Sequence, residues 1–178
     1  MSNEKSCCCS ASSCCNTKSI TPYDKNDKWV TGEIFTLKGS VPVVSTNLHF
    51  KDIFGAWKVR WGIGRMNYKI SPGLYAVGKP DHTSPVLVSA NYKLTFDVLR
   101  KELSGLNCWI LILDTKGINV WCAAGKGTFG TDELVNRISK TGLSEIVSHR
   151  KLVLPQLGAP GVSAHEVTKQ TGFSVVYG

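Results

Sequence analysis

One cysteine lies in a run of small residues that could bring a thiol close to a large, flat ligand. Residues 119–130 read N-V-W-C-A-A-G-K-G-T-F-G, with Cys122 between Trp121 and the small residues Ala123 and Ala124. A thiolate is a soft donor suited to soft or transition metals, and small residues let a backbone approach such a ligand. The alternative interpretation is that Cys122 is a small buried hydrophobic residue in a tight turn.

Composition indicates one globular domain with an ordinary core. The chain has 178 residues, of which 42% are hydrophobic and 19% charged. Its formal net charge is +8, but the basic residues are scattered and form no run of five or six. Because no nucleic-acid-reading motif accompanies the charge, we expect no nucleic-acid partner, and an acidic protein partner or a phosphate-bearing cofactor fits the charge as well.

The N-terminal segment differs in composition from the rest of the chain. Five of the seven cysteines fall there, together with Ser, Asn and Lys, and they are Cys7, Cys8, Cys9, Cys14 and Cys15. Their spacing matches neither a zinc site nor an iron–sulfur motif. We expect residues 1–27 to be a disordered tail, either simply flexible and prone to oxidation or able to bind soft metals. No signal peptide or membrane-spanning run is visible, which favours a soluble, cytosolic protein.

The pattern of apolar residues predicts an α/β fold. Residues 29–45 indicate short antiparallel strands, and residues 51–60 a helix. From residue 73, short apolar runs of the kind found in parallel sheets alternate with helical stretches at residues 94–103, 132–140 and 164–170. Thr131 is the expected N-cap of the second stretch, and Ser163 with Glu166 forms a capping box at the third. We therefore predict a Rossmann-like, open, mostly parallel sheet with helices on both faces, plus a short N-terminal β segment.

This architecture predicts where a ligand would bind. Ligands of open α/β sheets occupy the crevice at the carboxyl ends of the strands. The segments at those ends are residues 89–92, 114–117 and 155–161, and the loop that carries Cys122 follows the second of them. We expect the thiol and these three segments to converge on one edge of the sheet.

The sequence lacks the residues of several common types of functional site. The two G-x-G segments, at residues 62–64 and 125–127, lack the third glycine of a dinucleotide-binding loop, and the phosphate-binding G-x-x-x-x-G-K-[ST] spacing is absent. A cysteine nucleophile needs a histidine base, and no recognisable signature surrounds any of the four histidines, which are His49, His82, His149 and His165. A cysteine-based hydrolase or redox domain remains an alternative hypothesis.

The octapeptide N-V-W-C-A-A-G-K resembles the cap-helix signature of the mercury-methylating corrinoid proteins (the HgcA family). These are relatives of the large subunit of the corrinoid iron–sulfur protein of acetyl-CoA synthesis. The segments S-P-V-L-V-S-A-N-Y-K-L-T-F, L-I-L-D-T-K-G-I-N-V and K-L-V-L-P-Q-L-G-A-P-G-V also resemble that family's corrinoid domain. The resemblance covers roughly residues 51–178. The histidine motif D-x-H-x-x-G of other cobalamin-binding proteins does not occur here.

The resemblance implies a base-off cobalamin or related corrinoid on the strand ends, with the Cys122 thiolate as lower axial ligand of cobalt. The implied activity is corrinoid-dependent transfer of a methyl carbanion to Hg(II), giving methylmercury. The alternative is a corrinoid carrier that passes its methyl group to a partner protein. The implied cofactor site comprises Ser89, Asn91, Asp114, Thr115, Asn119, Val120, Trp121, Cys122, Ala123, Ala124, Gly125, Lys126, Leu154, Pro155, Gln156 and Gly158.

The resemblance also implies partners and a location. Methyl transfer to mercury would require a ferredoxin-like 4Fe-4S electron donor and a methylfolate-linked methyl donor. Members of that family continue into a C-terminal membrane domain. We therefore expect residues 28–178 to be the corrinoid-binding domain of a soluble fragment, whose full-length protein is anchored at the cytoplasmic face of a membrane.

Overall fold

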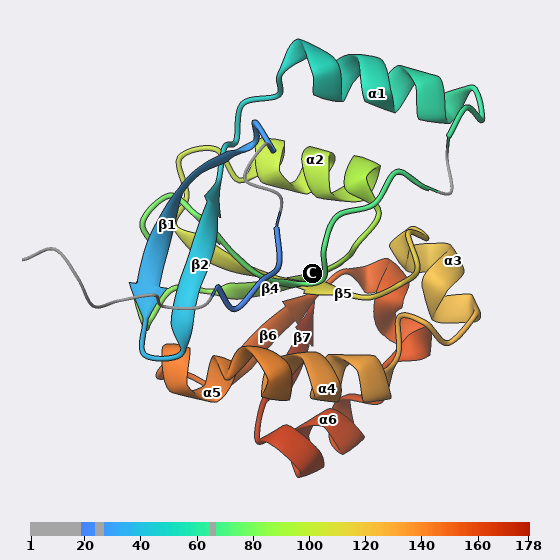
Figure 1. The fold of residues 1–178 in the computed structure, drawn as a ribbon. Helices are drawn as coiled ribbons and strands as arrows, with labels where there is room; N and C mark the ends of the chain where they lie inside the picture. Colours follow the sequence, from blue (N-terminus) through green and yellow to red (C-terminus); the bar gives the residue numbers. More distant parts are fainter. Residues whose placement is uncertain (1–18, 24–26, 65–66) are drawn as a thin grey trace, which may run out of the picture.

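The computed structural model describes residues 19–23, 27–64 and 67–178. In this part of the chain, a seven-stranded sheet has the order β1-β2-β3-β5-β4-β6-β7 (Figure 1). Four of its neighbouring pairs are parallel and two, β1 with β2 and β3 with β5, are antiparallel. The mostly parallel α/β fold predicted from the sequence is thereby confirmed. The strands are β1 (Val30–Thr36), β2 (Gly39–Val44), β3 (Gly73–Val77), β4 (Val86–Ala90), β5 (Cys108–Leu113), β6 (Lys151–Leu154) and β7 (Ser174–Tyr177).

Strand β3 is antiparallel to β5, although its continuous apolar run is typical of a parallel strand. A parallel return to the same sheet needs a crossover of a dozen or more residues. The connection from β3 to β4 covers only residues 78–85, so the chain turns back directly. The expected N-terminal antiparallel strands are present as the β1–β2 hairpin, in which Thr36 pairs with Gly39.

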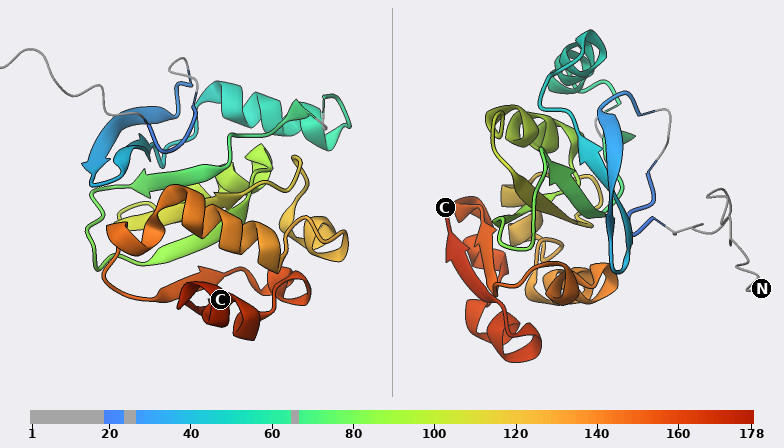
Figure 2. Two further views of the ribbon diagram at one scale, coloured as in Figure 1. Left: turned by 60° about the horizontal axis from the view of Figure 1, so that its bottom comes forward. Right: turned by 90° about the vertical axis from the view of Figure 1, so that its left-hand side faces the viewer.

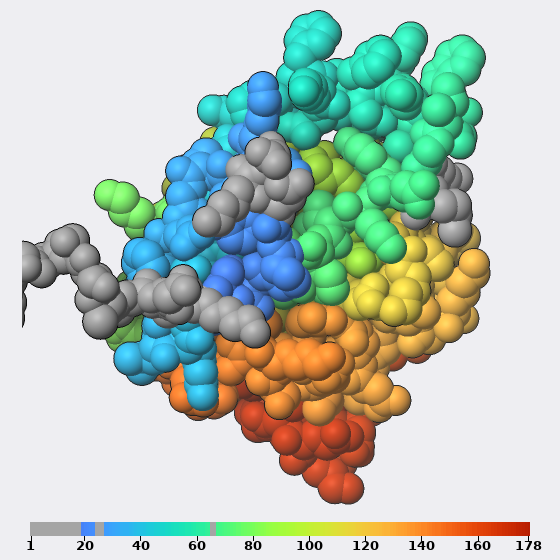
Figure 3. Space-filling view, in the orientation of Figure 1, coloured from blue at the N-terminus to red at the C-terminus, as the bar shows by residue number. Residues whose placement is uncertain are grey.

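Helices cover both faces of the sheet, as predicted (Figure 2). On one face, α2 contributes Phe96 to a cluster with Trp29 and Tyr75; on the other, α4 and α6 contribute Leu134 and Val167 to a larger core. The space-filling view shows α1 at the margin of the molecule (Figure 3). The helices are α1 (Phe50–Arg60), α2 (Lys93–Glu102), α3 (Val120–Gly125), α4 (Thr131–Thr141), α5 (Leu143–Ile146), the 3-10 helix η2 (Gln156–Gly161) and α6 (Ala164–Thr171).

The helix starts agree in part with the predicted caps. Ser163 caps α6 and its hydroxyl accepts a hydrogen bond from the Glu166 backbone N–H at 3.5 Å. The prediction for α4 is wrong, because Gly130 is the N-cap and Thr131 is the first helical residue. The Thr131 hydroxyl instead accepts a hydrogen bond from the Ser163 backbone N–H at 2.9 Å, which joins the starts of the two helices.

Part of the segment expected to be a tail contacts the sheet. The Ile20 backbone N–H donates to Ser40 O at 2.9 Å. Thr21 is fully buried, and its hydroxyl donates to Leu74 O at 2.7 Å and accepts from Leu74 N at 2.8 Å. The globular part of the chain therefore includes residues 19–21, whereas the N-terminal cysteines lie outside the described residues. Among the helices of the described part, none has the length and apolarity that crossing a bilayer requires.

Candidate functional site

Asn91 joins two of the strand ends expected to form the site. It follows β4 and is buried, with 2% of its surface exposed. Its side-chain oxygen accepts hydrogen bonds from Thr115 N (3.1 Å), Thr115 Oγ1 (2.8 Å) and Gly117 N (2.9 Å). Its Nδ2 donates to Asp114 Oδ1 at 3.2 Å. The segments after β4 and β5 thus converge as predicted, held by one amide side chain.

The loop after β5 is also fixed by charge. Lys116 has a left-handed backbone with φ of 60°. Its Nζ lies 2.6 Å from Asp114 Oδ2, and its backbone N–H donates to Asp114 Oδ1 at 3.1 Å. Burial raises the pKa of Asp114, but the hydrogen bonds and the charge of Lys116 outweigh burial and hold that pKa below its usual value. The loop therefore carries an ionised carboxylate at neutral pH.

The short helix α3 places the Cys122 thiol at its partly exposed side. Asn119 is the N-cap, and its side-chain oxygen accepts a hydrogen bond from the Cys122 backbone N–H at 2.9 Å. Val120 faces the interior, whereas Trp121 is 67% exposed. Cys122 has intermediate exposure, so the interpretation of Cys122 as a fully buried hydrophobic residue does not hold.

The small residues of α3 have a packing role that the sequence did not reveal. Ala123 and Ala124 are buried in the core that α3 shares with η2. A Cβ added to Gly161 would lie 2.1 Å from Phe129 O and 3.0 Å from Ala124 Cα. Since η2 needs this close approach, packing between protein segments accounts for the small size of Ala124 and Gly161. The interpretation of the small residues as a ligand surface stays a prediction beside this packing role.

An apolar crevice of about 380 Å³ lies at the ends of β4 and β6. The strand order reverses at this point, because β5 lies on one side of β4 and β6 on the other; such switch points are the usual ligand sites of open α/β sheets. Four predicted site residues line the crevice, namely Ser89, Val120, Leu154 and Pro155. The sequence did not single out the other lining residues, Leu87, Val88, Thr95, Val98, Leu99, Glu102, Val153 and Gly178.

The sequence contains a pattern that indicates the lining residues of α2. Thr95, Val98, Leu99 and Glu102 follow the helical spacing of i, i+3, i+4 and i+7. That spacing identifies one face of a helix, but which strands this face packs against depends on the order of strands in the sheet. Of the other predicted residues, Gly125, Lys126 and Gln156 are exposed and Gly158 is buried, and none of the four lines the crevice.

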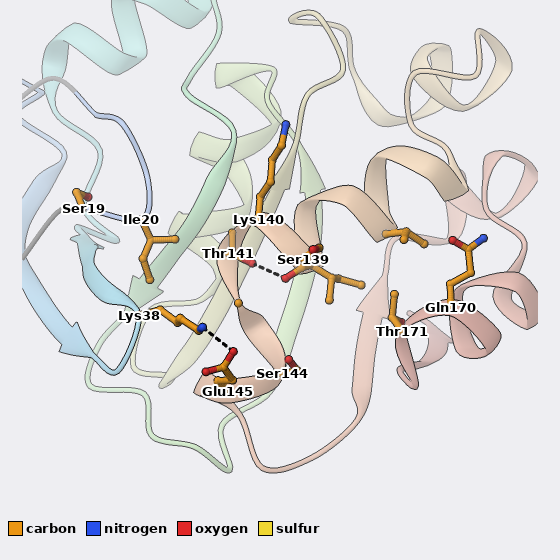
Figure 4. A pocket seen from close by; sticks show the side chains of 13 residues that line it. Ser19, Ile20, Lys38, Ser139, Lys140, Thr141, Ser144, Glu145, Gln170 and Thr171 are labelled. Carbon is orange, nitrogen blue, oxygen red and sulfur yellow. Dashed lines mark hydrogen bonds and ion pairs between the residues drawn. The ribbon is translucent and has the colours of Figure 1, made fainter.

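A larger pocket of about 710 Å³ lies elsewhere, beside α4 and α5 (Figure 4). Its lining is mainly polar and includes Lys140, Ser139 and an ion pair between Lys38 and Glu145 at 2.7 Å. None of the predicted site residues lines it. It lies away from the strand ends and contains no cysteine or histidine, so we place the candidate site at the crevice despite its smaller volume.

The two described cysteines differ in environment. Cys108 begins β5 and is buried, as predicted, and burial raises the pKa of its thiol to about 11. A thiol of that pKa stays protonated at neutral pH. Of the two described cysteines, Cys122 is the one with a partly exposed side chain.

Comparison with known proteins places this geometry in a family. Residues 64–178 match the family described as CO dehydrogenase/acetyl-CoA synthase delta subunit (CdhD). The chain belongs to this delta subunit family. The match includes the strand ends, the crevice, α3 and η2, and it confirms the relation to proteins of acetyl-CoA synthesis that the resemblance implied.

Individual relatives of the delta-family chain are gamma subunits of acetyl-CoA decarbonylase/synthase complexes. The protein from Methanocaldococcus jannaschii is 34% identical over 111 residues, which is 61% of this chain and 22% of the relative. The protein from Methanopyrus kandleri is 35% identical over 112 residues, with 62% and 24% covered. The gamma 2 subunit from Methanosarcina thermophila is 39% identical over 90 residues, with 48% and 19% covered. The chain thus spans less than a quarter of the length of these relatives.

Proposed function

We propose that this delta-family domain binds a corrinoid at the strand-end edge and carries a methyl group on it for delivery to a partner protein. The observation that carries the proposal is the apolar crevice at the switch point of the sheet, which Val120 of α3 lines, together with the partly exposed Cys122 on the same short helix. Gamma subunits of acetyl-CoA decarbonylase/synthase complexes are relatives by sequence. A complex that makes or breaks an acetyl group has to handle its methyl carbon, which supports a methyl carrier.

The residues present fit a corrinoid in their donor chemistry. Cys122 supplies one soft ligand, and a macrocycle supplies its own nitrogen ligands, so one protein donor is sufficient for cobalt. The crevice is lined chiefly by apolar side chains, including Val120 and Leu154, with the Ser89 hydroxyl among them. A mostly apolar lining with a few polar groups is typical of cofactor sites.

Each nearby residue has a positioning role in this proposal. Asn119 fixes the first turn of α3 and with it the Cys122 backbone. Asn91 holds the loop that contains the buried Thr115 and the partly exposed carboxylate of Asp114. Trp121 offers an exposed aromatic surface next to the thiol. A bound corrinoid would supply reversible methyl binding and transfer at cobalt, and the Cys122 thiolate would increase the electron density there.

A second candidate function is methylation of Hg(II), and the position of Cys122 at the partly exposed side of α3 favours it. Hg(II) is an electrophile, so it must receive the methyl group together with the bonding electron pair. The Cys122 thiolate, as a donor to cobalt, would stabilise the electron-poor metal and so would favour this direction of transfer. A ferredoxin-like 4Fe-4S donor would return two electrons, and a methylfolate-linked donor would provide the next methyl group. The net charge of +8 suits an acidic electron donor.

One experiment separates the two functions. The chain is loaded with methylcobalamin, freed of unbound cofactor, and mixed with a Hg(II)–thiol complex, and methylmercury is measured in a single turnover. For a mercury methylase we expect nearly one methylmercury per bound cofactor, and at least about tenfold less from a Cys122→Ala variant. Cys108→Ala is the matched cysteine control and should behave like the unmodified chain.

Other results have distinct meanings. If the cofactor binds but its methyl group stays on the protein with Hg(II) present, the carrier function is supported and the mercury function is contradicted. If methylcobalamin passes through the desalting column unretained, both proposals fail, and the hypothesis of a cysteine-based hydrolase or redox domain gains support.

A further inference from the structure

The helix α1 turns its large apolar side chains away from the molecule. Phe50 is 87% exposed and Trp57 62% exposed, and Trp61, at the C-cap of the helix, is 75% exposed. Ile53 and Phe54 are more than half exposed as well. With 3.6 residues per turn, these five positions form one stripe along the helix. Exposed apolar surface of this extent usually marks an interaction site.

Charge and close contact hold the opposite face of α1 to the body of the protein. Asp52 lies 2.9 Å from Lys93 Nζ and 2.7 Å from Arg100 Nη2, and both cations belong to α2. A Cβ added to Gly55 would lie 2.7 Å from the Tyr68 hydroxyl, so this glycine permits close packing. The helix is therefore anchored by its polar and small residues, and its apolar stripe is not needed for that attachment.

Cations border the apolar stripe on both sides. The helical period places Lys51 and Lys58 along one border and Arg60 along the other. Lys58 Nζ lies 5.8 Å from the centre of the Phe54 ring. Among the residues that the structure describes, these three cations form no salt bridge within 4.0 Å. Between Glu33 and Asp81 the sequence contains a single acidic residue, which is the inward-facing Asp52.

We propose that α1 is an interfacial helix that binds the surface of an anionic lipid bilayer. An apolar stripe rich in Phe and Trp, bordered by Lys and Arg, is the composition of helices that lie in the plane of a membrane interface. Aromatic residues favour the headgroup region, and basic residues are attracted to anionic lipids. Protein interfaces are instead depleted in lysine, so the two lysines beside the stripe favour lipid over a protein partner.

The position of α1 is compatible with this role. It is the outermost element on the α2 side, on the face of the molecule opposite α4 and α6 (Figures 1 and 2). Its side chains project at the edge of the space-filling view (Figure 3). A bilayer could contact the stripe without displacing a helix of the core.

Vesicle flotation tests this inference on the full chain without cofactor, so its result is independent of the proposed corrinoid function. We expect at least about tenfold stronger binding to vesicles containing phosphatidylglycerol than to phosphatidylcholine alone, with the difference reduced at high salt. The double variant Phe54→Ser/Trp57→Ser should lose binding by at least about tenfold. Lys51→Gln/Lys58→Gln should lose affinity for the anionic vesicles only.

The controls are residues of like chemistry elsewhere on the surface. Leu37, in the β1–β2 turn, is 91% exposed, and Leu37→Ser should bind vesicles like the unmodified chain. Lys140→Gln on α4 is the matched charge control. Circular dichroism spectra of the variants confirm that each is folded. Equal flotation of all variants, no binding to anionic vesicles, or a dimer in solution that dissociates in the Phe54→Ser/Trp57→Ser variant would each overturn the proposal.

Discussion

At the residue scale, the side chain of Asn91 holds the strand-end loop through hydrogen bonds. Its side-chain oxygen receives three hydrogen bonds from the loop after β5, and its amide donates a fourth to Asp114. Loss of this side chain would remove the acceptor of the buried Gly117 N–H and one of the two acceptors of each Thr115 donor. Asn91→Ala should therefore lower the free energy of unfolding by about 2 to 3 kcal/mol and weaken corrinoid binding.

Urea denaturation of Asn91→Ala and Asn107→Ala checks this prediction. Asn107 is an exposed asparagine whose side-chain oxygen accepts one hydrogen bond, from Lys79 N at 2.8 Å. Its replacement should cost less than about 1 kcal/mol. If the two variants unfold at the same urea concentration, the network around Asn91 does not stabilise the strand-end edge as described.

The sequence predicted the residues of this edge better than their roles. Asn91, Asp114 and Thr115 follow apolar runs, so the edge that they share could be predicted from the positions of the strand ends alone. The hydrogen bonds from Asn91 to the neighbouring loop could not be predicted, because the distance between Asn91 and Thr115 depends on the register between β4 and β5. Likewise, the packing of Ala124 against η2 could not be predicted, because Gly161 is distant from it in the sequence.

At the scale of elements, the contact between α3 and η2 sets the position of the thiol. A side chain at Gly161 would overlap Phe129 O, since an added Cβ would be 2.1 Å away. Gly161→Ala should therefore separate the two elements, cost about 1 to 3 kcal/mol, and lower corrinoid affinity although no ligand-contacting group has been removed.

Gly125→Ala is the matched stability control for Gly161→Ala. An added Cβ at Gly125 has no neighbour within 4 Å, and alanine stabilises a helix relative to glycine by up to about 1 kcal/mol. Thermal unfolding should thus shift in opposite directions for the two variants. A Gly161→Ala variant that is as stable as the unmodified chain would show that η2 does not hold α3 closely.

Local patterns decided which elements could be predicted. Alternation and apolar runs identified the strands and most helices, because each pattern depends only on neighbouring residues. The direction of β3 depends on the length of the connection to β4. The hydroxyl of Thr131, which was expected to cap α4, instead binds Ser163, a residue distant in the sequence. Helix α1 was predicted, but its outward apolar stripe was not, because periodicity does not say which face meets the sheet.

At the scale of the whole molecule, a buried charge network ties α1 to α2 and makes stability depend on pH. Burial raises the pKa of Asp52, but the hydrogen bond and charge of Lys93, with the charge of Arg100, outweigh burial and hold that pKa below its usual value. A carboxylate with a lowered pKa stabilises the fold above its unfolded pKa of about 4, and this stabilisation is lost as the pH falls further.

Unfolding free energies measured between about pH 7 and pH 3 test this dependence. For the unmodified chain we expect a decline below about pH 4. Asp52→Asn should be less stable at neutral pH by about 1 to 3 kcal/mol, and its decline with acid should be shallower. Curves that run parallel for the two proteins would contradict the role assigned to Asp52; Asp132→Asn, at an exposed position on α4, serves as the control.

The central claim is that the Cys122 thiolate binds the cobalt of a corrinoid held at the strand ends, and one spectrum tests it most directly. The chain is combined with cob(III)alamin, and its visible absorption is compared with that of Cys122→Ala and Cys108→Ala across pH. We expect a thiolate-to-cobalt absorption band for the unmodified chain and for Cys108→Ala that is absent from Cys122→Ala. Identical spectra for all three proteins with bound cofactor, or no binding by any of them, would contradict the claim.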